Sequence, residues 1–578
     1  MVLVGKQREE NVAEPVLEEL IADDRTPWFK KPNLRRLYVI LFAACMGIEI
    51  TSGFDSQIIN TVQIVYTWSK CESPAPWSVS ACIKTEAVVD FGHESGKIVD
   101  GRPQWIIGSN LKGFLGASYS LGAIISLPFV PYLNQLVGRR WTIMFGSCVS
   151  LVGALLQGFS NGVAMYVVAR MILGFGIPFC IVAGSSLLGE LGHPRERPIL
   201  TSLFNSSYYM GQIIAASVGL ATVNIASDWA WRIPSLLQIA PAMIQIMTVM
   251  YNALVYDFSS ARLTFSFRLL PESPRYLISK DRREEAFDIL TKYHAEGDRN
   301  SVLVKAEISQ IEQTIKLELE ESKQSWMDMF RTSGMRRRLF ISAFLGLFTQ
   351  WSGNTLISYY LSDLLNMVGI TNGTRKSKIN IGLACWSLIV GTTYAVLAPR
   401  WKRRPTYLIC AGSLLCVYIA WTISMERSIN TKSQASAILT IFFIFAYTPA
   451  YNLGYNALTY TYLIELFPYM GRSRGLSWFQ FYGRGASFFA TYVNPIGLDR
   501  IRWKWLLVYC CWLAFELIFI YLFFPETSGR TLEELSFLFE EKSKADQVAA
   551  AVHKEIDHSD EKKGAASHVE VREAKDVA

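Results

Sequence analysis

Three ionisable residues lie in segments that are otherwise apolar. Glu49 and Asp55 fall in the stretch 37–58, and Arg170 falls in the stretch 163–187. An ionisable group inside a membrane span is costly and usually marks a transport pathway. Because Asp55 and Arg170 carry opposite charges, pairing would lower the cost of both. An Asp that alternated between Arg170 and a proton would couple proton movement to a change of shape.

The residues alone leave a second interpretation open. Asp55 could lie at the outer end of its span, where water or a helix cap satisfies it. Glu49 lies six positions before Asp55 and therefore on another face of the helix. Its role stays ambiguous, and it needs a partner of its own.

A further group of polar and aromatic side chains could bind a polyhydroxylated ligand. Amides can hydrogen-bond to hydroxyls, and aromatic rings offer flat apolar faces to the CH-rich faces of a sugar ring. For any single residue, packing between helices is the commoner role, but their number in one chain favours a sugar site. The candidates are Gln212, Gln350, Asn354, Tyr359, Tyr360, Tyr460 and Trp478.

These side chains are positioned by long apolar segments. Of 578 residues, 51% are hydrophobic and only 18% are charged, against about a quarter in soluble domains. A helix needs roughly 20 mostly apolar residues to cross a bilayer. The sequence therefore predicts an all-α membrane protein with twelve spans. They are 37–58, 111–131, 141–159, 163–187, 201–223, 233–252, 339–361, 378–398, 405–425, 435–458, 475–495 and 504–524.

Charge in the loops predicts the orientation. Arg and Lys are concentrated after spans 2, 4, 8 and 10, which places those loops, both termini and the long middle loop in the cytoplasm. The predicted parts are a cytoplasmic segment 1–36, a six-helix half 37–270 with an extended external loop 61–112, a cytoplasmic helical loop 271–338, a second six-helix half 339–526, and a largely disordered cytoplasmic tail 527–578.

Charge and cysteine content exclude other classes of site. The net charge of +7 does not indicate nucleic acid, because the basic residues cluster between the spans. The cysteines show no metal-ligand spacing, so no metal and no organic cofactor is expected. No nucleophile–base set or phosphate-binding loop indicates an enzyme.

Several motifs resemble the sugar porter family of the major facilitator superfamily. They are GRR (138–140), ELGHPRER (190–197), PESPRYL (271–277) and PETSGRTLEEL (525–535). QWSGN (350–354) and NPIGLD (494–499) resemble its fungal lactose-permease-like branch. The resemblance covers about 37–540. It implies a fold of twelve helices in which two six-helix halves rock around a site near the midplane.

The resemblance also implies roles for individual residues. Asp55, in Gly53-Phe54-Asp55, matches the proton-carrying Asp of symporters, and Arg170 matches its partner. Gln212 and Gln350 match sugar-binding glutamines. Thr355 stands at the family's Asn position, with Asn354 one place earlier, and Tyr460 stands where the family often has Trp. The proton is then the coupling ion.

Charged residues at the cytoplasmic helix ends match clusters that latch the outward-open state of the family by salt bridges. The same arginines could simply enforce orientation. The residues concerned are Arg139, Arg140, Glu190, Arg197, Arg403, Arg404, Glu465 and Arg474.

Two segments fit the family poorly. Residues 251–268 and part of 66–112 have no family counterpart, which suggests retained introns or gene-model errors. Alternatively, they are real loops with an external disulfide between Cys71 and Cys82. Asn372-Gly373-Thr374 is a possible glycosylation acceptor on the predicted outer side.

The leading expectation is a proton-coupled symporter for a mono- or disaccharide. It would act as a monomer in the lipid bilayer of the plasma membrane. A transporter or exporter of another small polar solute, or a non-transporting sugar sensor, remains the alternative.

Overall fold

The computed structural model describes residues 28–64, 93–99, 102–106, 108–225, 227–254, 270–321, 329–397, 401–431, 433–467 and 472–527. Within these ranges, seven helices are long and apolar enough to cross a membrane, or eight when the pair α6 and α7, bent by 54°, counts as one span. One of the seven, Arg474–Phe523, contains two antiparallel helices. Three further spans fall outside these counts because each is divided into two shorter helices. Each membrane-spanning unit, whole or divided, is here named a rod, and the described ranges contain twelve rods.

The first six rods form the N-terminal half. They are α2 (Pro32–Leu41), η2 (Phe42–Met46) and α3 (Gly47–Ile64); α6 (Ser109–Ser126) and α7 (Phe129–Val137); α8 (Arg139–Gly158); α9 (Val163–Leu191); α10 (Arg197–Ser206) and α11 (Tyr208–Thr222); α12 (Trp229–Leu237) and α13 (Ile239–Leu254).

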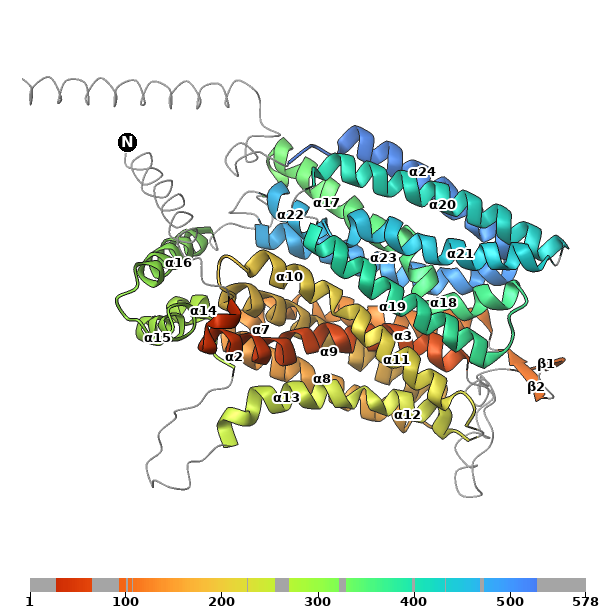
Figure 1. Cartoon of the computed structure of the whole chain (residues 1–578), viewed down its shortest axis with the longest axis horizontal. Coiled ribbons are helices and arrows are strands. Elements are labelled where there is room, and N and C mark those ends of the chain that lie inside the picture. The colour runs from red at the N-terminus through yellow and green to blue at the C-terminus, as the bar shows by residue number, and fades with distance from the viewer. Residues whose placement is uncertain are drawn as a thin grey trace, which may run out of the picture.

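The last six rods form the C-terminal half. They are α17 (Ser333–Trp351) and α18 (Asn354–Met367); α19 (Gly373–Leu397); α20 (Arg403–Thr431); α21 (Gln434–Tyr451), η5 (Asn452–Asn456) and α22 (Thr459–Leu466); α23 (Arg472–Ile501); η7 (Arg502–Lys504) and α24 (Trp505–Phe523). Figure 1 shows the two halves lying beside each other along the long axis.

The two ends of the molecule differ. Three helices, α14 (Pro274–Ser279), α15 (Arg283–His294) and α16 (Val302–Glu321), project at one end, here named the loop-helix end (Figure 1). The opposite end, here named the hairpin end, carries the antiparallel strands β1 (His93–Val99) and β2 (Arg102–Ile106). This hairpin lies in the segment predicted as an external loop, and it is a local departure from an all-α chain.

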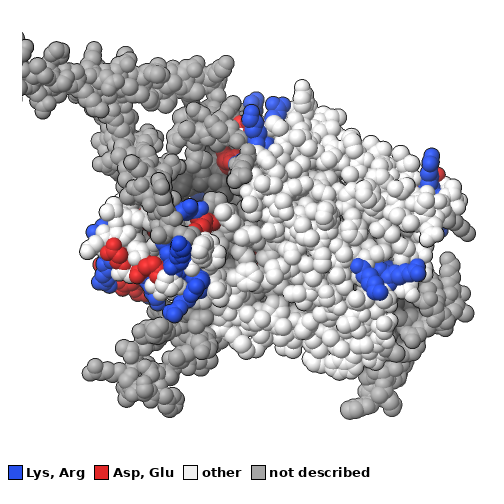
Figure 2. Space-filling model, viewed as in Figure 1, with Lys and Arg blue, Asp and Glu red and all other residues white. Residues whose placement is uncertain are grey.

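Charge is distributed as a membrane protein requires. On the face shown in Figure 2, coloured charged side chains gather at the loop-helix end and in small groups at the opposite end, and the broad surface between them is uncharged. Apolar side chains cover the exposed sides of the rods, among them Phe145, Ile389, Ile409 and Phe442. The belt of apolar side chains between two charged ends fits the hydrocarbon core of a bilayer.

Small residues allow the rods to pack closely. A Cβ added to Gly174 in α9 would lie 1.9 Å from the carbonyl oxygen of Tyr119 in α6, and one added to Gly122 would lie 2.0 Å from that of Met171. Glycine is therefore required where these two helices cross. This crossing holds Arg170 and Tyr119 side by side.

Several expectations fall outside the described residues. These are the whole segment 66–92, which includes Cys71 and Cys82, the segment 255–269 and the tail beyond Thr527. The first rod begins at Pro32, five residues before the predicted span, because proline is favoured in the first turn of a helix.

Candidate functional site

A cavity of about 270 Å³ lies between the two halves. All six residues predicted to bind substrate line it, which brings together side chains from α11, α17, α18 and α22. They are Gln212, Gln350, Asn354, Thr355, Tyr359 and Tyr460. Two other aromatic candidates do not line it: Tyr360 donates to the Thr491 carbonyl at 2.6 Å, and Trp478 packs against Phe330.

A break in the seventh rod positions two of the amides. Helix α17 ends at Trp351 and α18 begins at Asn354, with Gly353 between them at φ +100°. An L-residue rarely adopts this backbone, whereas glycine does so without strain. Gln350 and Asn354 therefore flank the break, and both face the cavity.

Asp55 is fully buried in the N-terminal half. Its Oδ1 accepts a 2.6 Å hydrogen bond from Nε2 of Gln238, the residue between α12 and α13. Its Oδ2 has no hydrogen-bond partner among the described residues. Burial in the bundle contradicts the interpretation that Asp55 is solvated at the membrane surface.

Arg170 lies within Coulombic range of Asp55 but makes no ion pair with it within 4.0 Å. The expected direct pair is therefore absent in this conformation. The Arg170 guanidinium instead lies 5.2 Å from the ring centroid of Tyr119, and its three nitrogens have no hydrogen-bond partner in the described part of the chain. Tyr119 lines the cavity and thus lies between Arg170 and the substrate space.

Other lining residues were not predicted as site residues. Tyr209 in α11 donates to Oδ1 of Asn452 in η5 at 2.8 Å, which joins the halves beside the cavity. Glu49, left ambiguous above, lines the cavity from α3, and Arg484 lines it from α23. Both are charged residues in apolar segments, so the criterion that selected Asp55 would also have selected Arg484.

The Arg pair at the start of α8 forms a charge cluster at the loop-helix end. The Arg139 guanidinium pairs with Glu190 at 3.0 Å. The backbone N–H groups of Arg139 and Arg140 donate to Oε1 of Glu272 at 3.1 and 3.3 Å. The Ser273 hydroxyl donates to Glu190. Burial raises the pKa of Glu272, and these backbone hydrogen bonds oppose that effect.

The C-terminal half repeats this cluster at the start of α20. Arg403 pairs with Glu465 at 2.8 Å. The N–H groups of Arg403 and Arg404 donate to the two oxygens of Glu526 at 3.0 and 3.1 Å. The Thr527 hydroxyl donates to Glu465 at 2.5 Å. The P-E-S and P-E-T motifs therefore supply equivalent groups, in which the Glu binds a helix N-terminus, as the helix dipole favours.

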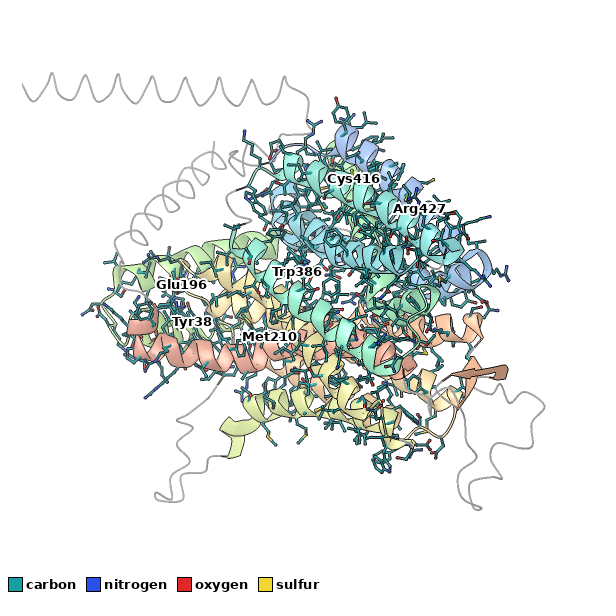
Figure 3. All side chains as sticks on the ribbon, turned by 45° about the vertical axis from the view of Figure 1, so that its right-hand side comes forward. Tyr38, Glu196, Met210, Trp386, Cys416 and Arg427 are labelled. Atoms are coloured by element: carbon teal, nitrogen blue, oxygen red, sulfur yellow. The ribbon has the colours of Figure 1, made fainter. Side chains whose placement is uncertain are left out.

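The first cluster joins the N-terminal half to the start of the middle segment, and the second joins α20 and α22 to the residues that follow α24. Glu272 and Glu526, which complete them, were not predicted as site residues, although both stand in the quoted motifs. The Arg197 side chain lies outside the described residues, and Arg474 lies in the first turn of α23. Tyr38 of α2 and Glu196 lie together (Figure 3), with Tyr38 donating to Glu196 at 2.6 Å.

An ion pair and hydrogen bonds join the two halves at the hairpin end. Lys112 Nζ pairs with Asp363 Oδ2 at 2.5 Å. Asn60 in α3 donates to the Ser358 carbonyl and accepts from the Leu361 N–H at 3.1 Å. Asn372, the possible glycosylation acceptor, is exposed at this end. No group of three His, Cys, Asp or Glu that could hold a metal occurs in the described ranges.

The comparisons with known proteins agree with this architecture. The family model described as "Sugar (and other) transporter" matches residues 39–252 and 254–539. The chain is 23% identical over 530 residues to a high-affinity glucose transporter of Kluyveromyces lactis, covering 88% of this chain and 86% of that protein. It is 24% identical over 426 residues to Sugar transport protein 1 of Arabidopsis thaliana, covering 72% and 76%.

Solved structures share the fold. The proton:xylose symporter XylE bound to 6-bromo-6-deoxy-D-glucose superimposes with a TM-score of 0.65 at 18% identity, covering 88% of this chain and 100% of that one. The partially occluded inward-open conformation of XylE from E. coli gives 0.64 at 18% identity, covering 86% and 100%. The prediction of a twelve-helix major facilitator fold is confirmed, as is the expectation that the protein is not an enzyme. The chain belongs to the Sugar (and other) transporter family of membrane transport proteins.

Proposed function

We propose that this protein is a proton-coupled sugar symporter that works by alternating access. The observation that carries the proposal is Asp55. A carboxyl group fully buried in a membrane bundle, with one oxygen unpartnered among the described residues, is suited to binding a proton. Arg170 lies within Coulombic range of Asp55, so a small movement of either group changes the energy of their interaction.

Tyr119 provides a physical connection between the proton site and the substrate. Its ring centroid lies 5.2 Å from the Arg170 guanidinium, and the residue lines the cavity. A ligand that displaces the Tyr119 side chain would move its ring relative to Arg170 and thereby alter the distance from Arg170 to Asp55. Coupling would then arise from this displacement.

The cavity favours a small polyhydroxylated substrate. Its volume is near the lower end of the range for small-molecule sites, so a monosaccharide fits it better than a disaccharide. The lining combines amides with tyrosine rings, as a sugar requires. A lactose-like specificity therefore has less support from the cavity than a hexose or pentose has.

The loop-helix end is proposed to face the cytoplasm, and the membrane to be the plasma membrane. The positive charges of the Arg pairs at the starts of α8 and α20 favour that side. With the hairpin end outside, the ion pair and hydrogen bonds between the halves at that end lie on the external side of the cavity. The cavity is lined by one chain, so the protein is proposed to act as a monomer.

Uptake by proteoliposomes tests the proposal. The purified protein should accumulate radiolabelled D-glucose or D-xylose when an inward proton gradient is imposed. Asp55→Asn fixes a neutral side chain that keeps shape and hydrogen bonding, so it should abolish accumulation and leave sugar exchange partly intact. Asp55→Asn also removes the opposite charge within Coulombic range of the buried Arg170, so size-exclusion profiles must be compared to detect misfolding.

Asp499→Asn is the matched control, because Asp499 is an exposed residue at the end of α23. It should accumulate sugar as the wild type does. Gradient-driven accumulation that persists in Asp55→Asn would exclude Asp55 as the proton site. Absence of any sugar uptake or binding by the wild type would exclude sugar transport itself.

A further inference from the structure

Two opposite charges face each other across the substrate cavity. Glu49 lies on α3 in the N-terminal half, and Arg484 lies on α23 in the C-terminal half. Both side chains line the cavity and lie within Coulombic range of each other. No nitrogen–oxygen distance between them is 4.0 Å or less, so they are separated rather than joined in an ion pair.

The groups around this pair are polar and face the same space. Tyr460 lies within Coulombic range of both charges, and its hydroxyl accepts a 2.8 Å hydrogen bond from Gln480. Tyr119 lies within range of Arg484, and its buried hydroxyl has no hydrogen-bond partner among the described residues.

We propose that Glu49 and Arg484 form a charge filter that selects neutral polyhydroxylated substrates and rejects sugar acids and amino sugars; this inference rests on the proposed sugar transport. A hydroxyl group donates one hydrogen bond and accepts others, so a sugar can donate to Glu49 and accept from Arg484 at once. Each of these hydrogen bonds is charge-assisted and therefore strong.

Charged analogues meet repulsion from one member of the filter. A sugar carboxylate that approaches Arg484 also approaches Glu49, and a sugar ammonium that approaches Glu49 also approaches Arg484. Like charges brought together in a desolvated site are strongly disfavoured. Together the two side chains add no net charge to the lining, so only a neutral ligand leaves the cavity neutral.

The distance between Glu49 and Arg484 can also change during the transport cycle. Its members belong to different halves, so rocking of the halves changes the distance between them. A neutral sugar that binds both would draw the halves together around itself. The specificity and the closure of the cavity would therefore depend on the same two side chains.

Competition binding on the purified protein tests the filter. D-glucose, D-xylose, D-glucuronate and D-glucosamine are compared at about pH 7.5, where the sugar carboxylate is ionised and roughly half or more of the amine is protonated. The wild type should prefer the neutral sugars. Glu49→Gln should improve D-glucuronate binding by about tenfold or more relative to D-glucose, and should not improve D-glucosamine. Arg484→Gln should do the reverse.

Controls separate charge from folding. Arg500→Gln removes a cation from the exposed end of the same helix and should leave the preference unchanged. The double variant Glu49→Gln/Arg484→Gln keeps the site neutral and should lose discrimination against both charged analogues, which tests the filter even if one single variant fails to fold.

The outcomes distinguish this inference from the proposed function. A wild type that binds D-glucuronate or D-glucosamine as well as D-glucose would overturn the filter and leave sugar transport standing. So would equal shifts in both single variants. A wild type that binds none of the four sugars would overturn the proposed function.

Discussion

Gln238 is the direct partner of Asp55, and its role can be tested on its own. Gln238→Ala removes the donor to Oδ1 and leaves a buried carboxyl without a hydrogen bond. An unsatisfied buried group of this kind costs about 1–3 kcal/mol. The variant should therefore unfold at lower temperature and should also shift the pH profile of sugar uptake.

Gln245→Ala is the matched control, because Gln245 lies on the same rod and binds Ser147 and Thr51 but not Asp55. It should lower stability without moving the pH profile. An unchanged pH profile in Gln238→Ala would show that Gln238 does not position the proton site.

The cavity amides give a second prediction at the scale of single residues. Gln212→Ala and Gln350→Ala should each weaken sugar affinity by about tenfold, because a bound hydroxyl loses its partner at about 1–3 kcal/mol. Titration calorimetry measures this directly. Gln157→Ala is the control, since Gln157 is buried against Tyr166 away from the cavity. Unchanged affinity in both cavity variants would contradict the assigned site.

Site residues that stand in a recognisable motif could be predicted from the sequence, and those without a motif could not. Gln212, Gln350 and Tyr460 could be chosen because motifs mark them, and the fold brings all three to one cavity. Gln238 carries no motif, and its contact with Asp55 joins positions 183 apart in the chain. No local pattern encodes such a contact, which arises only when the two rods pack.

At the scale of elements, the break between α17 and α18 should be needed for binding. Gly353→Ala places a methyl group on a backbone at φ +100°, with the added Cβ 1.7 Å from the Tyr418 hydroxyl. Strain of this kind costs about 1–3 kcal/mol, and the steric clash adds to it. Both thermal stability and sugar affinity should fall, because Gln350 and Asn354 flank the break.

The control is Gly412→Ala in the middle of α20, where an added Cβ meets no atom within 4 Å. Alanine is the better helix former, so stability should stay the same or rise. Wild-type sugar affinity in Gly353→Ala would show that the break does not position the amides.

Helices were easier to predict than their interruptions. Long apolar runs identify every rod, because crossing a bilayer imposes a length and a composition. The breaks after Trp351 and Tyr451 depend on packing partners such as Tyr418, and apolar periodicity does not reveal these. The helices of the middle segment could be predicted from their charge pattern, but their attachment through Glu272 to the start of α8 could not.

At the scale of the whole molecule, the sequence predicts two six-helix halves but not their conformation. The halves follow from the count of spans and from the charged segment between them. Which end is closed depends on contacts between the halves, such as those of Asn60 and Lys112, whose partners lie 251 to 301 residues away. Two conformations use the same twelve helices, so a pattern of spans cannot select between them.

The pair formed by Lys112 and Asp363 should stabilise the conformation that is closed at the hairpin end. Its side chains are 15% and 23% exposed, so solvent screening limits its contribution to about 1 kcal/mol. Lys112→Gln should shift the population toward opening at that end. A cysteine label at exposed Thr371 near the hairpin end, paired with one on the other half at Ser109, would report the shift as a longer spin–spin distance.

The control variant Lys378→Gln removes an exposed cation from the neighbouring α19 and should not shift this distance. Exchanging the charges in Lys112→Asp/Asp363→Lys should restore the closed population in part, although Lys376, which also lies within Coulombic range of Asp363, would then face a second cation. An unchanged distance distribution in Lys112→Gln would mean that Asn60 and its backbone partners hold this end closed without the ion pair.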